Sequence, residues 1–240
     1  MKNTEFLSNP NSSLTFRPIA LVYKNDSGQA ACEGCSEAVA SLLQNNTSWN
    51  FDVRYVGPHE TLSVQAGLSL PNARVFAQPG GNGSVNQAYK EMKPFESAIK
   101  NFIQNGGRYL GFCEGGYLAG EAPGFKLLPG DTGEYIKTHG ATVRNTKDAV
   151  IQVVWRNKKR WMYFQDGPYF ILNPGANATI LATYTNGKIA AVVTPYENGR
   201  VGVVGPHPEA DTSWYNEYHL HDPDGTDEDL GQDLINTTMQ

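Results

Sequence analysis

The sequence has 240 residues, of which 40% are apolar, and a formal net charge of -5 at neutral pH. This length and apolar content suit one domain with a sizeable core. The acidic balance argues against a nucleic-acid partner, which would need a basic face, and no apolar run is long enough to span a membrane. The polar stretch from Met1 to Arg17 has no signal-peptide core, and residues 1–18 are expected to form a flexible N-terminal segment.

The first half of the chain alternates apolar runs, typical of buried strands, with segments of helical spacing. Predicted strands cover residues 19–23, 51–56, 73–77 and 108–112, and predicted helices cover residues 33–43 and 86–104. This order predicts an open, mostly parallel α/β sheet, with its functional site at the carboxyl ends of the strands.

The second half contains a series of short strands separated by turn signals such as Asn157-Lys158-Lys159 and Asn186-Gly187. The predicted strands cover residues 134–139, 149–155, 160–164, 178–185, 189–195 and 200–204. We expect the last of them to return to the central sheet. From residue 211 onward the chain is acidic and polar, and residues 211–240 are expected to be a solvated tail with at most a short helix.

One stretch, Gly111-Phe112-Cys113-Glu114-Gly115-Gly116-Tyr117, has the pattern of a nucleophile elbow. Glycines flank a single cysteine between a strand and a helix, because the turn is too tight for larger side chains. The positive end of that helix favours the reactive thiolate form of Cys113. The alternative is a buried structural cysteine beside a turn.

Two further stretches supply the groups that a cysteine nucleophile requires. Strand 200–204 is followed by His207, a candidate base, and by Glu209, a candidate acceptor that would orient the imidazole. Strand 73–77 is followed by Gly80 and Gly81, whose backbone N–H groups are candidate oxyanion donors together with that of Glu114. The alternatives are a histidine that caps a strand end and a Pro-Gly-Gly turn that only reverses the chain.

These motifs resemble the class I glutamine amidotransferase-like superfamily, and within it the N-terminal domain of yeast-type biotin–protein ligases. The resemblance covers residues 19–210 as one domain, without a following ligase domain, as in a free-standing member. It implies a flavodoxin-like sheet with a nucleophile elbow, additional antiparallel strands in the second half, and a Cys113-His207-Glu209 triad. The stretches that carry it are 77–81, 111–117, 128–130, 163–167, 180–184, 190–193 and 205–209.

The sequence departs from the amidotransferase pattern at the elbow. In that class a glutamine stands four residues after the cysteine and helps to bind the substrate, whereas this chain has Tyr117 there. Relatives of another type place histidine directly after the cysteine, where this chain has Glu114. The sequence therefore predicts a cysteine hydrolase or amidase acting on a small amide, peptide or ester through a thioester, rather than a glutaminase. The alternative is a non-catalytic binding or regulatory module that retains the fold.

Cys32 and Cys35 form a Cys-x-x-Cys pair between the first strand and the first helix. A structural disulfide is preferred over a redox centre, although a thiol-redox protein is a further alternative, and the pair is expected to flank Cys113. One free thiol would remain, which fits an oxidising compartment. Asn-x-Ser/Thr sequons also favour a secreted glycoprotein over a cytoplasmic one; they begin at Asn11, Asn25, Asn45, Asn46, Asn82, Asn177 and Asn236.

The remaining candidates are positions that would line a substrate pocket. Asp166 follows a predicted strand and is a candidate substrate-binding residue, as is Tyr117, whose ring is otherwise a core side chain. We expect no cofactor and no metal site, because the other histidines have no partners at metal-ligand spacing. The expected partner is a small-molecule or peptide substrate; the oligomeric state is left open.

Overall fold

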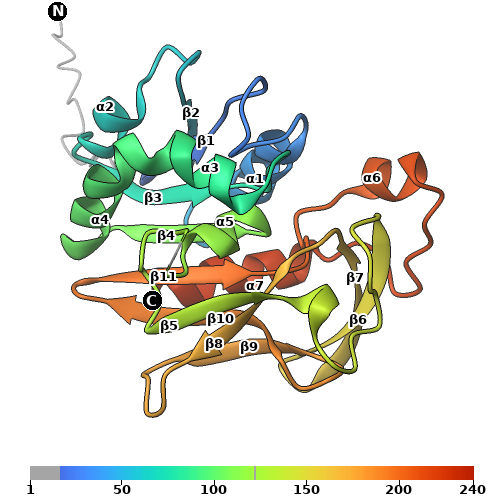
Figure 1. Cartoon of the computed structure of the whole chain (residues 1–240). Coiled ribbons are helices and arrows are strands. Elements are labelled where there is room, and N and C mark those ends of the chain that lie inside the picture. The colour runs from blue at the N-terminus through green and yellow to red at the C-terminus, as the bar shows by residue number, and fades with distance from the viewer. Residues whose placement is uncertain (1–16, 122) are drawn as a thin grey trace, which may run out of the picture.

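The computed structural model describes residues 17–121 and 123–240, which form one continuous sheet covered by helices (Figure 1). The strands are β1 Ile19–Tyr23, β2 Asp52–Val56, β3 Ala73–Gln78, β4 Arg108–Phe112, β5 Gly130–Glu134, β6 Ala149–Trp155, β7 Lys158–Phe164, β8 Pro168–Leu172, β9 Thr179–Tyr184, β10 Ile189–Tyr196 and β11 Gly199–Val204. The helices are α1 Cys35–Gln44, α2 Val64–Leu68, α3 Val85–Met92, α4 Glu96–Gln104, α5 Glu114–Leu118, α6 Thr212–Glu217 and α7 Glu228–Met239.

The central part of the sheet is parallel, in the order β2-β1-β3-β4-β11. Beyond β11 the sheet continues through antiparallel pairs, in the order β10-β9-β6-β7, and β8 joins β5 to β10. The predicted fold class is therefore confirmed: a flavodoxin-like, mostly parallel sheet in the first half is extended by antiparallel strands in the second. The return of β11 to β4 is also as expected, with Val204 paired to Phe112.

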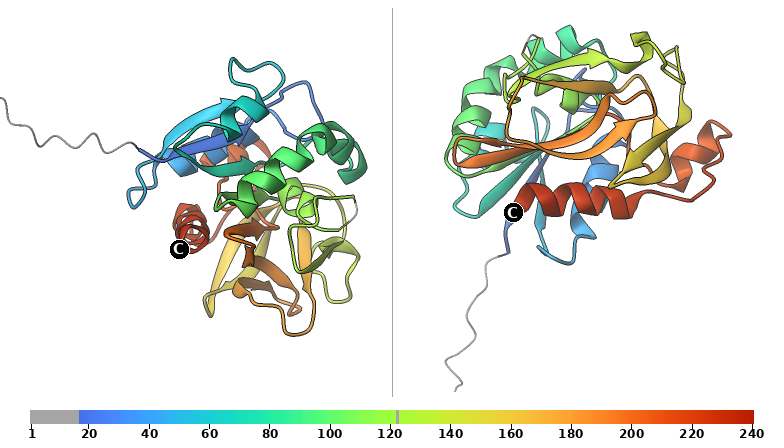
Figure 2. Two further views of the ribbon diagram at one scale, coloured as in Figure 1. Left: turned by 90° about the vertical axis from the view of Figure 1, so that its left-hand side faces the viewer. Right: turned by 90° about the horizontal axis from the view of Figure 1, so that it is seen from below.

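Each face of the parallel sheet buries its own apolar core, because side chains alternate along a strand. In β1, Ala20 and Val22 face the core under α1 and α7, whereas Leu21 and Tyr23 face the core under α2, α3 and α4. Figure 2 shows α7 on the opposite side of the sheet from α3 and α4. Because both faces are covered, the central strands are apolar throughout, as the sequence indicated.

The prediction of a solvated tail over residues 211–240 is wrong. Helix α7 packs against α1, β4, β10 and β11, and its apolar side chains join the core on that face. Those side chains, Leu230, Leu234, Ile235 and Met239, have helical spacing that the acidic composition of the segment obscured. The acidic residues instead bind cations of the sheet, as in the Asp233–Arg156 pair at 2.9 Å. The folded unit thus extends to the C-terminus.

Other differences are local. The predicted strand 134–139 is wrong: β5 ends at Glu134, and a 3₁₀ turn over Tyr135–Lys137 follows. There the Tyr135 ring stacks on that of Tyr184 with the ring centroids 3.9 Å apart, which holds the segment out of the sheet. The predicted helix 86–104 is interrupted at Lys93–Phe95 because Pro94 lacks a backbone N–H. The sequence also missed β8 and α2.

The predicted flexible segment 1–18 lies, except for its last two residues, outside the described part of the chain. Arg17 itself is held, because its Nε donates a hydrogen bond to the backbone oxygen of Asn50 at 2.8 Å. Within residues 17–121 and 123–240, every helix is too short or too polar to cross a lipid bilayer.

Candidate active site

Cys113 sits at the sharp turn between β4 and α5, in a backbone conformation that few residues other than glycine adopt. Its φ is 47° and its ψ is -105°. The neighbouring glycines are required by close packing: a Cβ on Gly111 would lie 2.4 Å from the Gly115 oxygen, and one on Gly115 would lie 2.2 Å from the Gln78 oxygen. The strained turn predicted from the sequence is therefore present, and strain of this kind is concentrated at functional sites.

The side chains of His207 and Glu209 form a buried pair just beyond the end of β11. His207 Nδ1 lies 2.8 Å from Glu209 Oε1, and the two residues are only 4% and 6% exposed. The backbone N–H of His207 donates to the Tyr163 oxygen at 2.9 Å, and the rings of Tyr163 and Trp214 pack beside the imidazole. The imidazole is thus held in one orientation, with its second nitrogen left to act on other groups.

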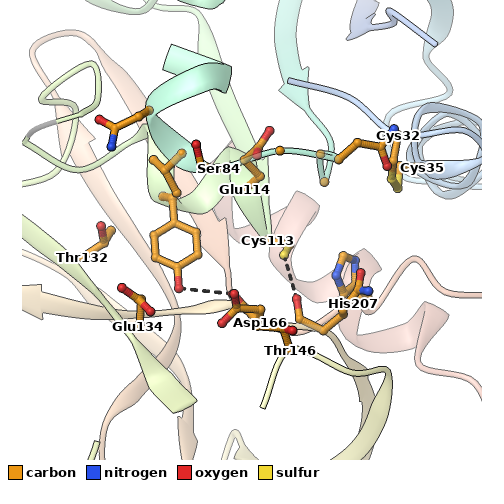
Figure 3. Close-up of a pocket in the computed structure, with 18 of the residues that line it drawn as sticks. Cys32, Cys35, Ser84, Cys113, Glu114, Thr132, Glu134, Thr146, Asp166 and His207 are labelled. Carbon is orange, nitrogen blue, oxygen red and sulfur yellow. Dashed lines mark hydrogen bonds between the residues drawn. A yellow bond between two sulfur atoms is a disulfide. The ribbon is translucent and has the colours of Figure 1, made fainter. Parts of the chain in front are cut away.

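Cys113 and His207 line the same cavity because β4 and β11 are parallel neighbours whose carboxyl ends meet at one edge of the sheet. A Cβ on Gly80 would lie 3.2 Å from His207 Cε1 and 3.9 Å from Cys113 Cβ, so the three residues converge. Figure 3 shows Cys113 and His207 in this cavity. Burial acts to lower the pKa of His207, but the negative charge of Glu209 and the neighbouring Cys113 side chain oppose this and raise it to about 10. The imidazole is therefore protonated at neutral pH, and its positive charge lies beside Cys113.

Gly80 and Gly81 follow β3 and lie between the elbow and the loop that joins β1 to α1. No hydrogen bond among the described residues uses the backbone N–H of Gly80 or Gly81, and these groups border the cavity. Gly81 has no room for a side chain, because a Cβ there would lie 1.8 Å from Glu114 Oε1. Burial, with a smaller contribution from Glu91, raises the pKa of Glu114 to about 9, so this carboxyl group is neutral at pH 7.

The cavity has a volume of about 700 Å³ and also contains the two candidate pocket residues, Tyr117 and Asp166. The Tyr117 hydroxyl donates to the backbone oxygen of Asp166 at 3.2 Å. One residue earlier, the backbone oxygen of Gln165 accepts a hydrogen bond from Cys113 Sγ at 3.4 Å. The loop between β7 and β8 therefore forms the wall that faces the nucleophile.

Cys32 and Cys35 form a disulfide with a Cα–Cα distance of 5.2 Å, and both residues line the cavity. Cys35 is only 4% exposed, and its sulfur lies 3.6 Å from the position that a Cβ on Gly80 would take. The expected disulfide and its expected place beside Cys113 are thus both found. Of the three cysteines in the sequence, Cys113 is the free one.

Sequence reasoning missed several residues of the cavity wall. Asn82, Ser84 and Asn86 follow the glycine loop, Asp131, Thr132 and Glu134 come from β5, and Trp214 comes from α6. Only folding brings these segments together, and no local motif marks them. Trp214 falls in the segment that was expected to be a tail. The four other histidines, His59, His139, His219 and His221, are exposed, and the described residues contain no group of three or more metal-ligating side chains placed to hold an ion.

The fold and this elbow define a class of protein: the chain has the class I glutamine amidotransferase-like fold. It is similar to a glutamine amidotransferase from Thermotoga maritima, with 13% identity over 93% of this chain and 99% of that one and a TM-score of 0.60. It is also similar to a protein from Thermoplasma acidophilum described as a GMP synthase component, with 12% identity over 92% and 95% of the two chains and a TM-score of 0.54.

More particularly, residues 20–134 match the family model described as biotin-protein ligase, N terminal, which confirms the resemblance seen in the sequence over that part of the chain. The fold also occurs inside larger enzymes: 93% of this chain overlays on 30% of a β-galactosidase from Bacillus circulans sp. alkalophilus, with 12% identity and a TM-score of 0.53. No curated protein matches the sequence.

Proposed function

We propose that this protein is a cysteine hydrolase that cleaves an amide or ester of a small molecule or peptide through a thioester intermediate. The observation that carries the proposal is the strained turn that holds Cys113 beside the buried His207–Glu209 pair in one cavity. A nucleophile, a base and a group that orients the base are the parts that acyl transfer requires.

The proposed reaction begins with the Cys113 thiolate attacking the carbonyl carbon. Backbone N–H groups of Gly81 and Glu114 stabilise the negative charge that develops on the carbonyl oxygen. The imidazolium of His207 donates its proton to the leaving amine or alcohol, which leaves an acyl-Cys113 thioester. Neutral His207 then takes a proton from water, the resulting hydroxide attacks the thioester, and the acid and the thiolate are released. Glu209 holds the imidazole in place in both steps.

The glutaminase reaction of the fold class is not proposed, because Tyr117 occupies the position of the substrate-binding glutamine. Its ring is buried and its hydroxyl is bonded to the Asp166 backbone, so it narrows that side of the cavity. The competing function, a binding module without turnover, would use the same cavity with an unreactive Cys113.

The test is the rate of iodoacetamide modification of Cys113 as a function of pH in the wild type and in His207→Ala. We expect rapid modification at neutral pH that slows about 10²-fold in the variant, because the imidazolium stabilises the thiolate. Hydrolysis of p-nitrophenyl esters with a burst of one equivalent would then demonstrate turnover. An ordinary thiol profile that the variant leaves unchanged would reject the hydrolase in favour of the binding module.

We also propose that the protein is secreted, because it contains a disulfide and Asn-x-Ser/Thr sequons. Two of the sequon asparagines are unsuited to glycans, because Asn25 and Asn46 are buried and bind Glu91 and Gln232, respectively. Asn45 and Asn177 are exposed. Mass spectrometry of protein from a eukaryotic secretory host should find glycans at Asn45 or Asn177 and none at Asn46; a glycan at Asn46 would contradict this structure of α1 and α7.

A further inference from the structure

The cavity around Cys113 is lined by acidic side chains without a basic counterpart. Its wall contains the carboxyl groups of Glu114, Asp131, Glu134 and Asp166, and none of the described residues that line it is Lys or Arg. The one group in the wall that carries positive charge is His207, next to the nucleophile. A substrate that enters this cavity meets negative charge on the side away from His207.

Three of these carboxyl groups are already hydrogen-bonded, ion-paired or neutral. Asp131 Oδ1 accepts from the backbone N–H groups of Glu121 and Thr132 at 2.9 and 2.8 Å. Glu134 is paired at 2.7 Å with the exposed Lys137, outside the cavity wall. Glu114, 5% exposed, is kept neutral by burial and has an unpartnered Oε1 against Gly81.

Asp166 shares one feature with Glu114, since its Oδ1 is also buried without a hydrogen-bond partner. It differs from Glu114 in being only partly buried, and from Glu134 in having no ion pair within 4.0 Å among the described residues. Burial and the charge of Glu134 raise its pKa, and the charge of Lys137 opposes this only in part. A buried oxygen of this kind costs free energy unless a ligand satisfies it.

The position of Asp166 relative to the nucleophile is fixed by backbone contacts. Its own oxygen accepts from Tyr117, and the preceding backbone oxygen, of Gln165, accepts from Cys113 Sγ. Its φ of 49° turns the chain sharply between β7 and β8. Figure 3 shows Asp166 and Cys113 on facing walls of the cavity, with Glu134 and Thr132 beyond Asp166.

We propose that the substrate carries a cationic amine near the scissile bond and no carboxylate there, and that Asp166 binds this amine. This inference rests on the proposed function and names its substrate class: amides or esters of amine-bearing acids, including peptides with a free amino group. A free carboxylate beside the scissile bond would face Asp166 without a basic residue to bind it, which disfavours anionic substrates.

The test uses small thiol reagents that report the charge preference of the cavity without requiring turnover. Cys113 is modified with 2-aminoethyl methanethiosulfonate, which is cationic, and with 2-sulfonatoethyl methanethiosulfonate, which is anionic. Each rate is divided by the rate of the same reagent with 2-mercaptoethanol, and the measurement is made at low salt because screening weakens charge preferences. The disulfide-bonded Cys32 and Cys35 do not compete, which leaves Cys113 as the reacting thiol.

We expect the wild type to prefer the cationic reagent by about tenfold or more after this correction, and Asp166→Asn to lose most of that preference. Asparagine tolerates the positive φ of this position, so the variant should fold. Asp52→Asn is the matched control: it removes the same charge from the partly exposed start of β2, at the opposite end of the sheet, and should leave the preference unchanged.

Equal corrected rates for the two reagents in the wild type, or a preference that Asp166→Asn leaves intact, would overturn the inference even if the protein proves to be a hydrolase. A preference for the cationic reagent that depends on Asp166, in a protein without esterase activity, would support Asp166 as the residue that binds the amine. It would reject the proposed hydrolase function. With turnover established, an amino-acid p-nitrophenyl ester with a free amine should exceed its N-succinyl derivative in kcat/KM by about tenfold, and Asp166→Asn should reduce that ratio.

Discussion

Among the described residues, His207 and Glu209 form the one buried pair of a histidine and a carboxylate. Their Nδ1 and Oε1 atoms lie 2.8 Å apart. His207 and Glu209 are two residues apart in the sequence, in a turn that follows β11 and is anchored by the His207 N–H to Tyr163. The pairing engages Nδ1, and the Cε1 edge of the ring lies at the Gly80 position beside Cys113. The proposed chemistry therefore depends on this short segment as much as on the nucleophile.

Glu209→Gln should lower the pKa of His207 from about 10, because the neutral amide cannot stabilise the imidazolium by charge. A less basic His207 takes the proton of Cys113 less readily, so more of Cys113 is the unreactive thiol at neutral pH and its modification should slow by about tenfold or more. A titration of the His207 ring by NMR and the iodoacetamide pH profile measure the two effects. Glu197→Gln, in the exposed β10–β11 turn, is the control. An unchanged His207 titration in Glu209→Gln would contradict the assigned role of Glu209.

Glu114 should make the fold less stable as the pH rises. Burial raises its pKa from 4.5 to about 9, so the folded state keeps a proton that the unfolded chain has released. The stabilisation is complete below pH 4.5, declines between pH 4.5 and 9, and is lost above pH 9, at a rate of at most about 1.4 kcal/mol per pH unit.

Glu114→Gln keeps the shape of the side chain without the titrating proton. The difference in unfolding free energy between variant and wild type, measured by urea denaturation at several pH values, should therefore grow in favour of the variant from pH 5 to pH 9. A constant difference across that range would mean that Glu114 is ionised in the folded protein.

The Cys32–Cys35 disulfide should behave as a structural crosslink. Because Cys35 is nearly fully buried, a reductant has little access to it, and the bond should stay oxidised in a glutathione buffer. Cys32→Ser with Cys35→Ser should lower the free energy of unfolding by about 2 kcal/mol, the effect of closing so short a loop. Reversible titration of the pair at potentials near that of glutathione would instead favour the thiol-redox alternative.

Leu234→Ala tests the corrected assignment of the C-terminal segment. Leu234 is fully buried between α7 and the sheet, so its truncation should reduce the free energy of unfolding by about 2–5 kcal/mol. Ile180→Ala, at a half-exposed position of β9, is the control and should cost less than about 1 kcal/mol. Urea denaturation measures both. A neutral Leu234→Ala variant would mean that residues 211–240 are the solvated tail that their composition suggests.

The sequence by itself determined the features that depend on neighbours along the chain. The glycines that bracket Cys113 mark a turn with no room for side chains, and the continuous apolar runs in β1 and β4 mark a sheet buried on both faces. Backbone sterics and side-chain periodicity are local properties, so these features could be predicted, together with the order of nucleophile, base and carboxylate.

Tertiary structure alone decided the features that join distant segments. The acidic composition of residues 211–240 concealed α7, since its aspartates are balanced by arginines near β6 and β7 that are distant in sequence. The charge of the cavity is likewise a sum over β5, the β7–β8 loop and the elbow. Charge balance and cavity lining depend on which segments become neighbours in space, and that is fixed only when the long-range contacts form.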